Sequence, residues 1–268
     1  MAIKVAIHGA AGRMGRMLVA QVMGDSETQL SGALEREDCP LLGQDAGTVA
    51  GLSASGVKIT ADAAAVLAAS DALIVFSAAG PTMDIARQAA EKGVALVIGT
   101  TGLTPENKAE LAELAKKTAI VFAANMSVGV NLLFSLCKKV ATLLDDSYDI
   151  EVVEMHHNQK KDAPSGTAER LGEILAEARG LSYEKDTRHG RVGMVGARTK
   201  KEIGMHSLRG GDVVGDHTVI FATEGERIEL THKASSRQTF AKGAVRAVKF
   251  LAAKKSGLFD MQDVLGLK

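Results

Sequence analysis

Between Lys4 and Ala123 the sequence alternates short apolar runs with longer segments of helical composition, and this alternation restricts the fold more than any other feature. The apolar runs have the length and the β-branched or small residues of buried strands. They lie at residues 4–8, 29–34, 72–76, 94–98 and 120–123. Strands that alternate with helices form a parallel sheet with right-handed crossover connections. This part of the chain is therefore predicted to be α/β, with a doubly wound parallel sheet of the Rossmann type.

A glycine-rich turn lies between the first predicted strand and the first predicted helix. It reads Gly9-Ala10-Ala11-Gly12-Arg13-Met14-Gly15, so that Ala11 replaces the second glycine of the G-x-G-x-x-G pattern. Glycine lets the backbone approach a pyrophosphate, and the N-terminus of a helix favours its negative charge. A tight turn without a ligand is the alternative. The position of the turn between strand and helix favours dinucleotide binding.

The second predicted strand ends at Glu35-Arg36, just past the distance at which such folds place a ribose-binding acid. The Glu35 carboxylate can accept hydrogen bonds from the adenosine ribose hydroxyls, whereas Arg36 can meet a 2′-phosphate. An exposed ion pair between them is the alternative. The pair therefore predicts tolerance of both NADH and NADPH.

Ligands of doubly wound sheets bind beyond the carboxyl ends of the strands. The loops predicted at that edge are rich in small and hydroxyl residues, which suit a nicotinamide and its ribose. The candidate cofactor-binding residues are Gly9, Ala10, Ala11, Gly12, Arg13, Met14, Glu35, Arg36, Gly99, Thr100, Thr101, Ala123, Ala124, Asn125 and Met126.

The pattern changes after an apolar helix predicted from Val128 to about Leu144. Further strands are predicted at 149–156, 203–209, 213–223 and 227–234, with Gly210-Gly211 and Glu224-Gly225-Glu226 as hairpin turns. We expect a Rossmann domain over 1–127 and an α+β domain with a mixed sheet over 128–237. A final helix in 238–268 is expected to pack back on the first domain. Broad sheets of this kind often associate with copies of themselves.

Side chains that can do chemistry are concentrated just after the strand predicted to end at His156. His156-His157, Lys160 and the segment Pro164-Ser165-Gly166-Thr167 lie within a dozen residues. Histidine can carry a proton near neutral pH, lysine holds a positive charge, and a helix N-terminus suits an anion. A site for a small carboxylated substrate is predicted here. A solvated basic loop is the alternative.

Composition and charge narrow the class of protein further. Lys+Arg and Asp+Glu are equal at 32 each, which argues against a nucleic-acid binder with a broad basic face. No apolar run has the length of a membrane span, and the chain enters its first strand too early for a signal peptide. Cys39 and Cys137 lack the spacing of a metal or redox site, so no metal is expected. A cytoplasmic protein is expected.

Several segments together resemble a known family. They are Gly9–Gly15, Gly99–Gly102, Ala123–Asn131, His156-His157 with Lys160 and Asp162–Ala168, and Thr231–Arg237. With these segments the chain resembles the 4-hydroxy-tetrahydrodipicolinate reductases, long called dihydrodipicolinate reductases. The resemblance covers essentially the whole chain, and the histidine-lysine block is its most specific part.

The resemblance implies a homotetramer that uses NADH or NADPH and a cyclic dicarboxylate substrate. It implies that His156 is a proton donor or acceptor, that Lys160 is a proton donor, and that His157, Gly166 and Thr167 hold substrate carboxylate. Some family members carry an arginine shortly after the strand that ends at Phe76, where this chain has Ser77-Ala78-Ala79. A phosphate contact from that loop is therefore in doubt.

Two other functions fit the sequence less fully. The first is another two-domain NAD(P)-dependent dehydrogenase that acts on an amino or keto acid, which the first domain alone does not exclude. The second is a non-catalytic sensor of NAD(H), which would not need the histidine-lysine block.

Overall fold

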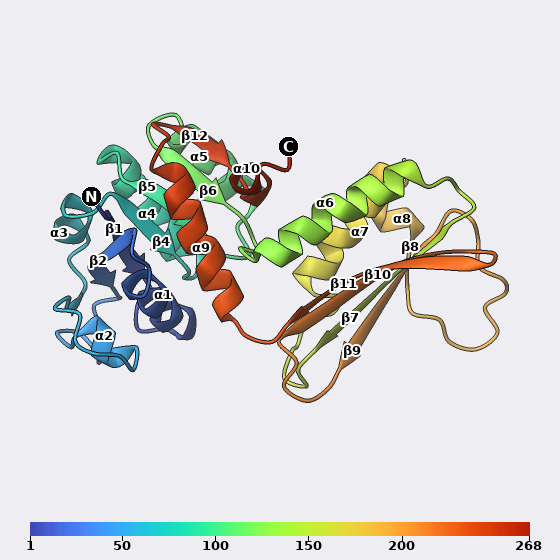
Figure 1. Ribbon diagram of the computed structural model, residues 1–268, viewed down its shortest axis with the longest axis horizontal. Helices are drawn as coiled ribbons and strands as arrows, with labels where there is room; N and C mark the ends of the chain where they lie inside the picture. Colours follow the sequence, from blue (N-terminus) through green and yellow to red (C-terminus); the bar gives the residue numbers. More distant parts are fainter. The chain divides into compact units, whose positions relative to one another are not determined.

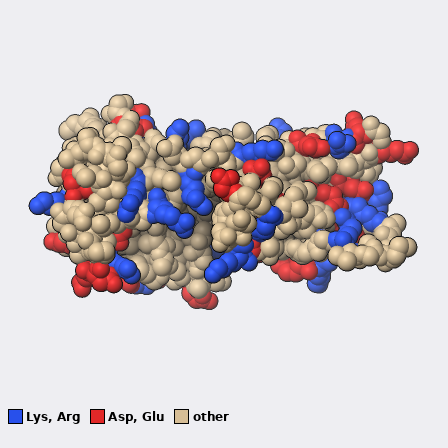
Figure 2. Space-filling view, turned by 90° about the horizontal axis from the view of Figure 1, so that it is seen from below, with Lys and Arg blue, Asp and Glu red and all other residues tan.

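The computed structural model describes residues 1–268, which divide into two compact units (Figure 1). Unit 1 contains residues 1–128 and 237–268, and unit 2 contains residues 129–236. No helix in either unit combines the length and the apolar character needed to cross a membrane. On the face drawn in Figure 2, basic and acidic side chains both occur over each unit, and most of the surface is uncharged.

Unit 1 is built on a parallel sheet of seven strands in the order β12-β6-β5-β4-β1-β2-β3. Its strands are short and mostly apolar, as expected where helices cover both faces. They are β1 (Ile3–His8), β2 (Thr28–Leu34), β3 (Ile59–Thr60), β4 (Ala72–Val75), β5 (Ala95–Ile98), β6 (Ala119–Phe122) and β12 (Gly257–Phe259). All the carboxyl ends of these strands meet at one edge, because every pairing is parallel.

Helices cover the two faces of this sheet in separate groups. One face buries Val5 and Ile7 with α1 (Arg13–Met23), α2 (Ala46–Val49), α9 (Gln238–Leu251) and α10 (Met261–Leu265). The other face buries Ala6 and Leu73 with α3 (Ala63–Ala68), α4 (Ala79–Glu91) and α5 (Pro105–Leu114). The predicted doubly wound sheet is therefore confirmed.

Helix α9 comes from the end of the chain and lies beside α1, which comes from its start (Figure 1). Its packed face consists mostly of alanine and valine, which lets the helix approach closely. Gly243 makes the tightest contact, because a Cβ atom there would lie 1.7 Å from the carbonyl oxygen of Met126. The contact joins α9 to the loop that follows β6.

Replacing Gly243 with alanine should destabilise unit 1, since backbone rather than a flexible side chain occupies the space. We expect the free energy of unfolding to fall by about 1–3 kcal/mol or more, the usual cost of overpacking. Gly80→Ala is the matched control, because a Cβ atom at Gly80 in α4 would meet nothing within 4 Å. Urea unfolding of both variants measures the difference. Equal stability of the two variants would contradict this account of the α9 contact.

The end of the chain differs from the single helix expected in 238–268. After α9 the chain adds β12 beside β6 and then the short helix α10. A three-residue strand has too few residues to show a periodic pattern, and pairing with β6 supplies the backbone hydrogen bonds that stabilise it. The four-residue helix α2, which follows β2, is also too short to show a periodic pattern.

Unit 2 contains a mixed sheet of five strands in the order β11-β10-β7-β9-β8. The strands are β7 (Asp149–His156), β8 (Thr187–His189), β9 (Ile203–Arg209), β10 (Gly215–Thr223) and β11 (Glu226–Ala234). Strands β7, β8 and β9 run parallel, whereas β10 is antiparallel to both of its neighbours. Helices α6 (Val128–Leu143) and α7 (Gly166–Ala178) cover one face, together with α8 (Tyr183–Asp186).

The hairpin predicted at Gly210-Gly211 is wrong, because β7 lies between β9 and β10. The connection instead crosses the end of β7 and binds the backbone there. Gly210 N–H donates to His156 O (2.9 Å), and His157 N–H donates to Val213 O (2.8 Å). A glycine pair indicates a turn, but it does not tell which strands lie on its two sides. The hairpin at Glu224-Gly225 is confirmed, with Thr223 paired to Glu226.

Candidate active site

The glycine-rich loop of unit 1 has the close backbone packing that the motif predicts. Gly9 adopts a φ of +82°, a conformation that favours glycine. A Cβ atom at Gly15 would lie 2.0 Å from Gly9 O, so α1 packs directly against the loop. No side chain caps α1 at Gly12. The N–H groups of its first turn can therefore serve an anion.

Glu35, which directly follows β2, binds the backbone of the glycine-rich loop. Its Oε1 accepts a hydrogen bond from Ala11 N–H (2.8 Å), so the carboxylate also fixes the loop backbone. Arg36 forms an ion pair with Asp38, with Nε 2.9 Å from Oδ1 and both side chains about three-quarters exposed. The alternative of an ion pair between Glu35 and Arg36 is not seen, because Arg36 pairs with Asp38, which lies two residues further on.

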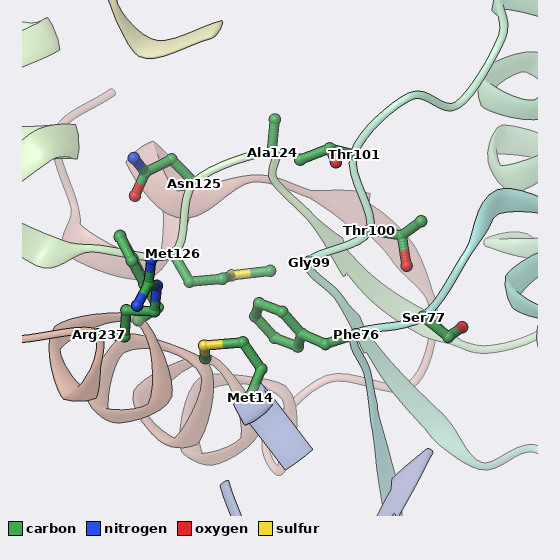
Figure 3. A pocket seen from close by; sticks show the side chains of 11 residues that line it. Met14, Phe76, Ser77, Gly99, Thr100, Thr101, Ala124, Asn125, Met126 and Arg237 are labelled. Carbon is green, nitrogen blue, oxygen red and sulfur yellow. The ribbon is translucent and has the colours of Figure 1, made fainter. Parts of the chain in front are cut away.

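A cavity of about 340 Å³ opens at the carboxyl edge of the sheet (Figure 3). The side chains of Met14, Phe76 and Met126 extend toward one another there, and Asn125 and Arg237 lie to one side. The complete lining is Met14, Phe76, Ser77, Gly99, Thr100, Thr101, Ala124, Asn125, Met126, Arg237 and Phe240. Apolar walls with a few polar groups are typical of a cofactor site.

The structure brings the predicted cofactor residues together at this edge in two groups. Met14, Gly99, Thr100, Thr101, Ala124, Asn125 and Met126 line the cavity itself. The others lie outside the lining, on the adjoining strand ends and loops or, for Arg13, at the start of α1: Gly9, Ala10, Ala11, Gly12, Arg13, Glu35, Arg36 and Ala123. Phe76, Ser77, Arg237 and Phe240 were not among the predicted residues. Arg237 and Phe240 are far from the others in sequence, and only the return of α9 places them here.

Hydroxyl groups tie the loops beside the cavity together. His8 Nδ1 lies 3.1 Å from Ser77 Oγ, which lies 3.0 Å from Thr82 Oγ1. Thr82 in turn lies 2.7 Å from Thr100 Oγ1. Burial lowers the pKa of His8, so its imidazole is neutral at neutral pH. The Ser77 hydroxyl therefore makes its contacts within the unit.

The predicted proton-transfer residue His156 lies at the end of β7 in unit 2, on the face covered by helices. Its Nδ1 lies 2.6 Å from Oε2 of Glu154, whose side chain is only 1% exposed. Arg209 donates to the same Oε2 (2.9 Å), and Ser165 N–H donates to Oε1 (3.2 Å). The four residues come from β7, β9 and the start of α7.

The pKa directions follow from these contacts. Desolvation alone would raise the pKa of Glu154, but hydrogen bonds from His156, Ser207 and Arg209 outweigh it and lower that pKa. Burial lowers the pKa of His156, although Glu154 opposes the shift. At neutral pH the pair is therefore a carboxylate beside a largely neutral imidazole.

A second histidine adjoins His156. The rings of His156 and His217 are 5.2 Å apart at 76°, and His217 Nε2 lies 3.1 Å from Ser165 Oγ. Burial lowers the pKa of His217 to about 3. His217 is therefore a neutral, buried part of this cluster.

The N-terminus of α7 is built as the sequence predicts for an anion site. Ser165 caps the helix by accepting a hydrogen bond from Ala168 N–H (3.2 Å). Gly166 is exposed, and a Cβ atom there would meet nothing within 4 Å, so the first turn opens onto free space. Thr167 is half-buried beside it. Backbone N–H groups in an open first turn suit a carboxylate.

Lys160 and His157 flank this helix start. Lys160 Nζ lies 2.7 Å from Oδ2 of Asp162, with 18% of the lysine side chain and 65% of the aspartate side chain exposed. Lys160 N–H donates to His157 O (3.1 Å), which closes a turn just after β7. The structure thus collects all five predicted catalytic and substrate-binding residues at one end of unit 2.

Glu154, Arg209 and His217 were not predicted as site residues. Glu154 had a recognisable signal, because residues two apart in a strand share a face and His156 follows it by two. Arg209 and His217 had no such signal in the sequence, because only the sheet order places β9 and β10 beside His156.

Comparisons with known proteins match this chain to one family over nearly its whole length. The family descriptions "Dihydrodipicolinate reductase, N-terminus" and "Dihydrodipicolinate reductase, C-terminus" match residues 3–126 and 129–265. The 4-hydroxy-tetrahydrodipicolinate reductase of Burkholderia lata is 56% identical over 99% of this chain and 100% of its own length. The corresponding reductase of Syntrophotalea carbinolica is 52% identical over the same shares.

Solved structures show the same fold. A dipicolinate-bound dihydrodipicolinate reductase from Paenisporosarcina sp. TG-14 has a TM-score of 0.79 and 26% identity, covering 98% of this chain and 99% of its own. An amine dehydrogenase from Mycobacterium smegmatis, 17% identical with a TM-score of 0.62, shares the fold alone; the alignment covers 96% of this chain and 94% of its own. Because the two family matches together span nearly its whole length, this chain belongs to the dihydrodipicolinate reductase family.

Proposed function

We propose that this chain reduces 4-hydroxy-tetrahydrodipicolinate to tetrahydrodipicolinate with NADH or NADPH, in the diaminopimelate route to lysine. The observation that carries the proposal is the assembly of His156, Lys160 and the open start of α7 at one end of unit 2. Full-length relatives named for this activity support it.

The chemistry requires a hydride and a proton. Loss of water from the substrate gives a conjugated cyclic imine, hydride addition leaves an electron-rich enamine, and protonation completes the reduction. The nicotinamide supplies the hydride and leaves oxidised. Lys160 and His156 are the groups that can hold or move the proton, and a positioned acid lowers the barrier to that step.

Two substrate carboxylates need fixed partners, and unit 2 offers several. We assign one carboxylate to the N–H groups of Gly166 and Thr167 at the start of α7, with His157 beside them. Lys160 adds positive charge. The dipicolinate bound by the Paenisporosarcina relative is a cyclic dicarboxylate, which supports this substrate class. Fixed positioning of this kind contributes much of an enzyme's rate.

The cavity of unit 1 fits the nicotinamide half of the cofactor, and the glycine-rich loop fits its pyrophosphate. Glu35 and Arg36 would meet the adenosine ribose and a 2′-phosphate. We therefore assign cofactor binding to residues 1–127 with the returning segment 238–268, and substrate binding to residues 128–237.

The direct assay follows the absorbance of NADH or NADPH with substrate freshly made by the synthase that precedes this reaction. We expect cofactor oxidation that depends on both the substrate and this protein. A protein that binds NADH but oxidises none of it under these conditions would contradict the proposal and favour a sensor.

Both cofactors should bind, with affinities that differ by less than about a thousandfold. Asp38→Asn should raise NADPH affinity by up to about fivefold and leave NADH affinity unchanged, because an exposed partner competes weakly for Arg36. Glu37→Gln is the control, since it removes the same charge one residue away from that ion pair. Titration calorimetry with both cofactors measures the effect. Equal gains in the two variants would show a general charge effect instead.

We further propose that the chain forms a homotetramer in the cytoplasm. The sheet of unit 2 has no helices on the face that carries Val153, Met155, Leu208 and Ile220, and Leu208 is 49% exposed. An uncovered sheet face with apolar side chains suits a second copy of the same face. The proposed dependence of this chain on NADH or NADPH supports the cytoplasmic location.

A further inference from the structure

Glu154 is the most enclosed charged group of unit 2, and its contacts account for both oxygens. Oε2 receives His156 Nδ1 (2.6 Å) and Arg209 (2.9 Å), and Oε1 receives the backbone N–H of Ser165 (3.2 Å). The side chain is 1% exposed. None of these contacts reaches a position open to substrate, so Glu154 can act only through its neighbours.

The contact with His156 determines which ring nitrogen is available for chemistry. An ionised carboxylate only accepts hydrogen bonds, so neutral His156 must carry its hydrogen on Nδ1. Nε2 is then left as the atom that can take up or release a proton. This nitrogen makes no hydrogen bond within the chain, and it lies against Gly215, where a Cβ atom would be 3.0 Å away. Any larger residue at Gly215 would crowd it.

The contact with Ser165 links the same carboxylate to the anion site. Ser165 is the N-cap of α7, and its N–H is held by Glu154 Oε1 while its hydroxyl caps the helix. A single side chain thus sets the position of the His156 ring and of the helix start that would hold a substrate carboxylate.

We infer that Glu154 is a positioning residue for the reduction, which presents Nε2 of His156 and holds the start of α7 in register with it. This inference rests on the proposed function and names a residue that acts through His156 rather than on the substrate.

The charged and titratable groups that face His156 predict opposite shifts of its pKa in two variants. Glu154 on β7 favours protonated His156, whereas Arg209 on β9 and Lys160 in the following loop oppose it. His217 on β10 is neutral, because its pKa is about 3. Removing the Glu154 charge should therefore lower the pKa of His156, and removing the Arg209 charge should raise it.

The experiment compares pH profiles of kcat for the full-length wild type, Glu154→Gln and Arg209→Gln. The relevant limb of the profile is the one that His156→Gln abolishes. In Glu154→Gln we expect kcat to fall by about 10–100-fold, as for other partners that fix a histidine tautomer. The limb should also move to lower pH. In Arg209→Gln the carboxylate remains, and the limb should move to higher pH.

Glu151→Gln is the matched control. Glu151 lies on the same strand but on its opposite face, and it also binds a histidine (His206 Nε2, 2.6 Å) and an arginine (Arg198 Nε, 2.9 Å). Its loss should leave the limb in place. NADH affinity, measured by titration, should be the same in all variants. If Glu154→Gln does not fold, the direction in which the limb moves in Arg209→Gln alone tests the inference.

The inference would be overturned if the limb stayed in place in Glu154→Gln or Arg209→Gln, or if it moved equally in Glu151→Gln. An active wild type would still uphold the proposed function in that case. A wild type without activity on the freshly made substrate would instead refute the proposed function.

Discussion

His156→Gln should lower kcat by about 10²–10⁴-fold, the usual worth of a positioned acid or base. The histidine lies at the end of β7 with Nδ1 held by Glu154, so its other nitrogen is the group placed for proton transfer. Glutamine keeps a similar size and a hydrogen-bonding end but cannot carry the proton. NADH affinity should stay unchanged, because the glycine-rich loop and the cavity belong to unit 1.

The control for this variant is His206→Gln. His206 also lies on the unit 2 sheet with a carboxylate partner at 2.6 Å, but its partner Glu151 is on the opposite face. Steady-state kinetics and thermal melting of both variants separate a chemical role from a structural one. A folded His156→Gln enzyme with near wild-type kcat would show that this histidine is structural.

Lys160→Ala should lower kcat/KM by about 10²–10³-fold, with a fall in kcat and a rise in KM together. The lysine side chain is only 18% exposed, and a partly buried cation has a stronger field than a fully exposed one. It can serve both to attract a substrate carboxylate and to protonate the enamine that hydride addition leaves. Loss of both roles should appear in both kinetic parameters.

Lys161→Ala is the control for Lys160→Ala, because the adjacent lysine is exposed. It removes the same charge from the same loop. We expect a change of less than about threefold, since exposed charges are largely screened. Similar losses in the two variants would mean that general attraction of the substrate, rather than a placed group, explains the effect.

The parallel sheet could be predicted because β4, β5 and β6 of unit 1 are continuous apolar runs. Such runs occur where helices cover both faces of a sheet, and the glycine-rich turn marks the first crossover. The strand that ends at His156 could be predicted as well, because the run from Ile150 to Met155 is largely apolar and β-branched. Local sequence determines these features.

Features that depend on distant partners could not be predicted. The three residues of β12 form a strand only beside β6, and Gly210-Gly211 crosses the end of β7 instead of turning a hairpin. The neighbours of His156 show the same limit. Arg209 comes from β9 and His217 from β10, and only the sheet order brings these side chains to one point.

The central claim is that this chain transfers a hydride to a cyclic imine, and isotope transfer tests it most directly. The protein is given NADH with deuterium at the transferred position of the nicotinamide, together with freshly made substrate, and the product is examined by mass spectrometry. We predict tetrahydrodipicolinate that carries one deuterium in place of hydrogen, and at least about a hundredfold less of it with His156→Gln over the same time. Unlabelled product, or NADH that remains unoxidised, would contradict the claim.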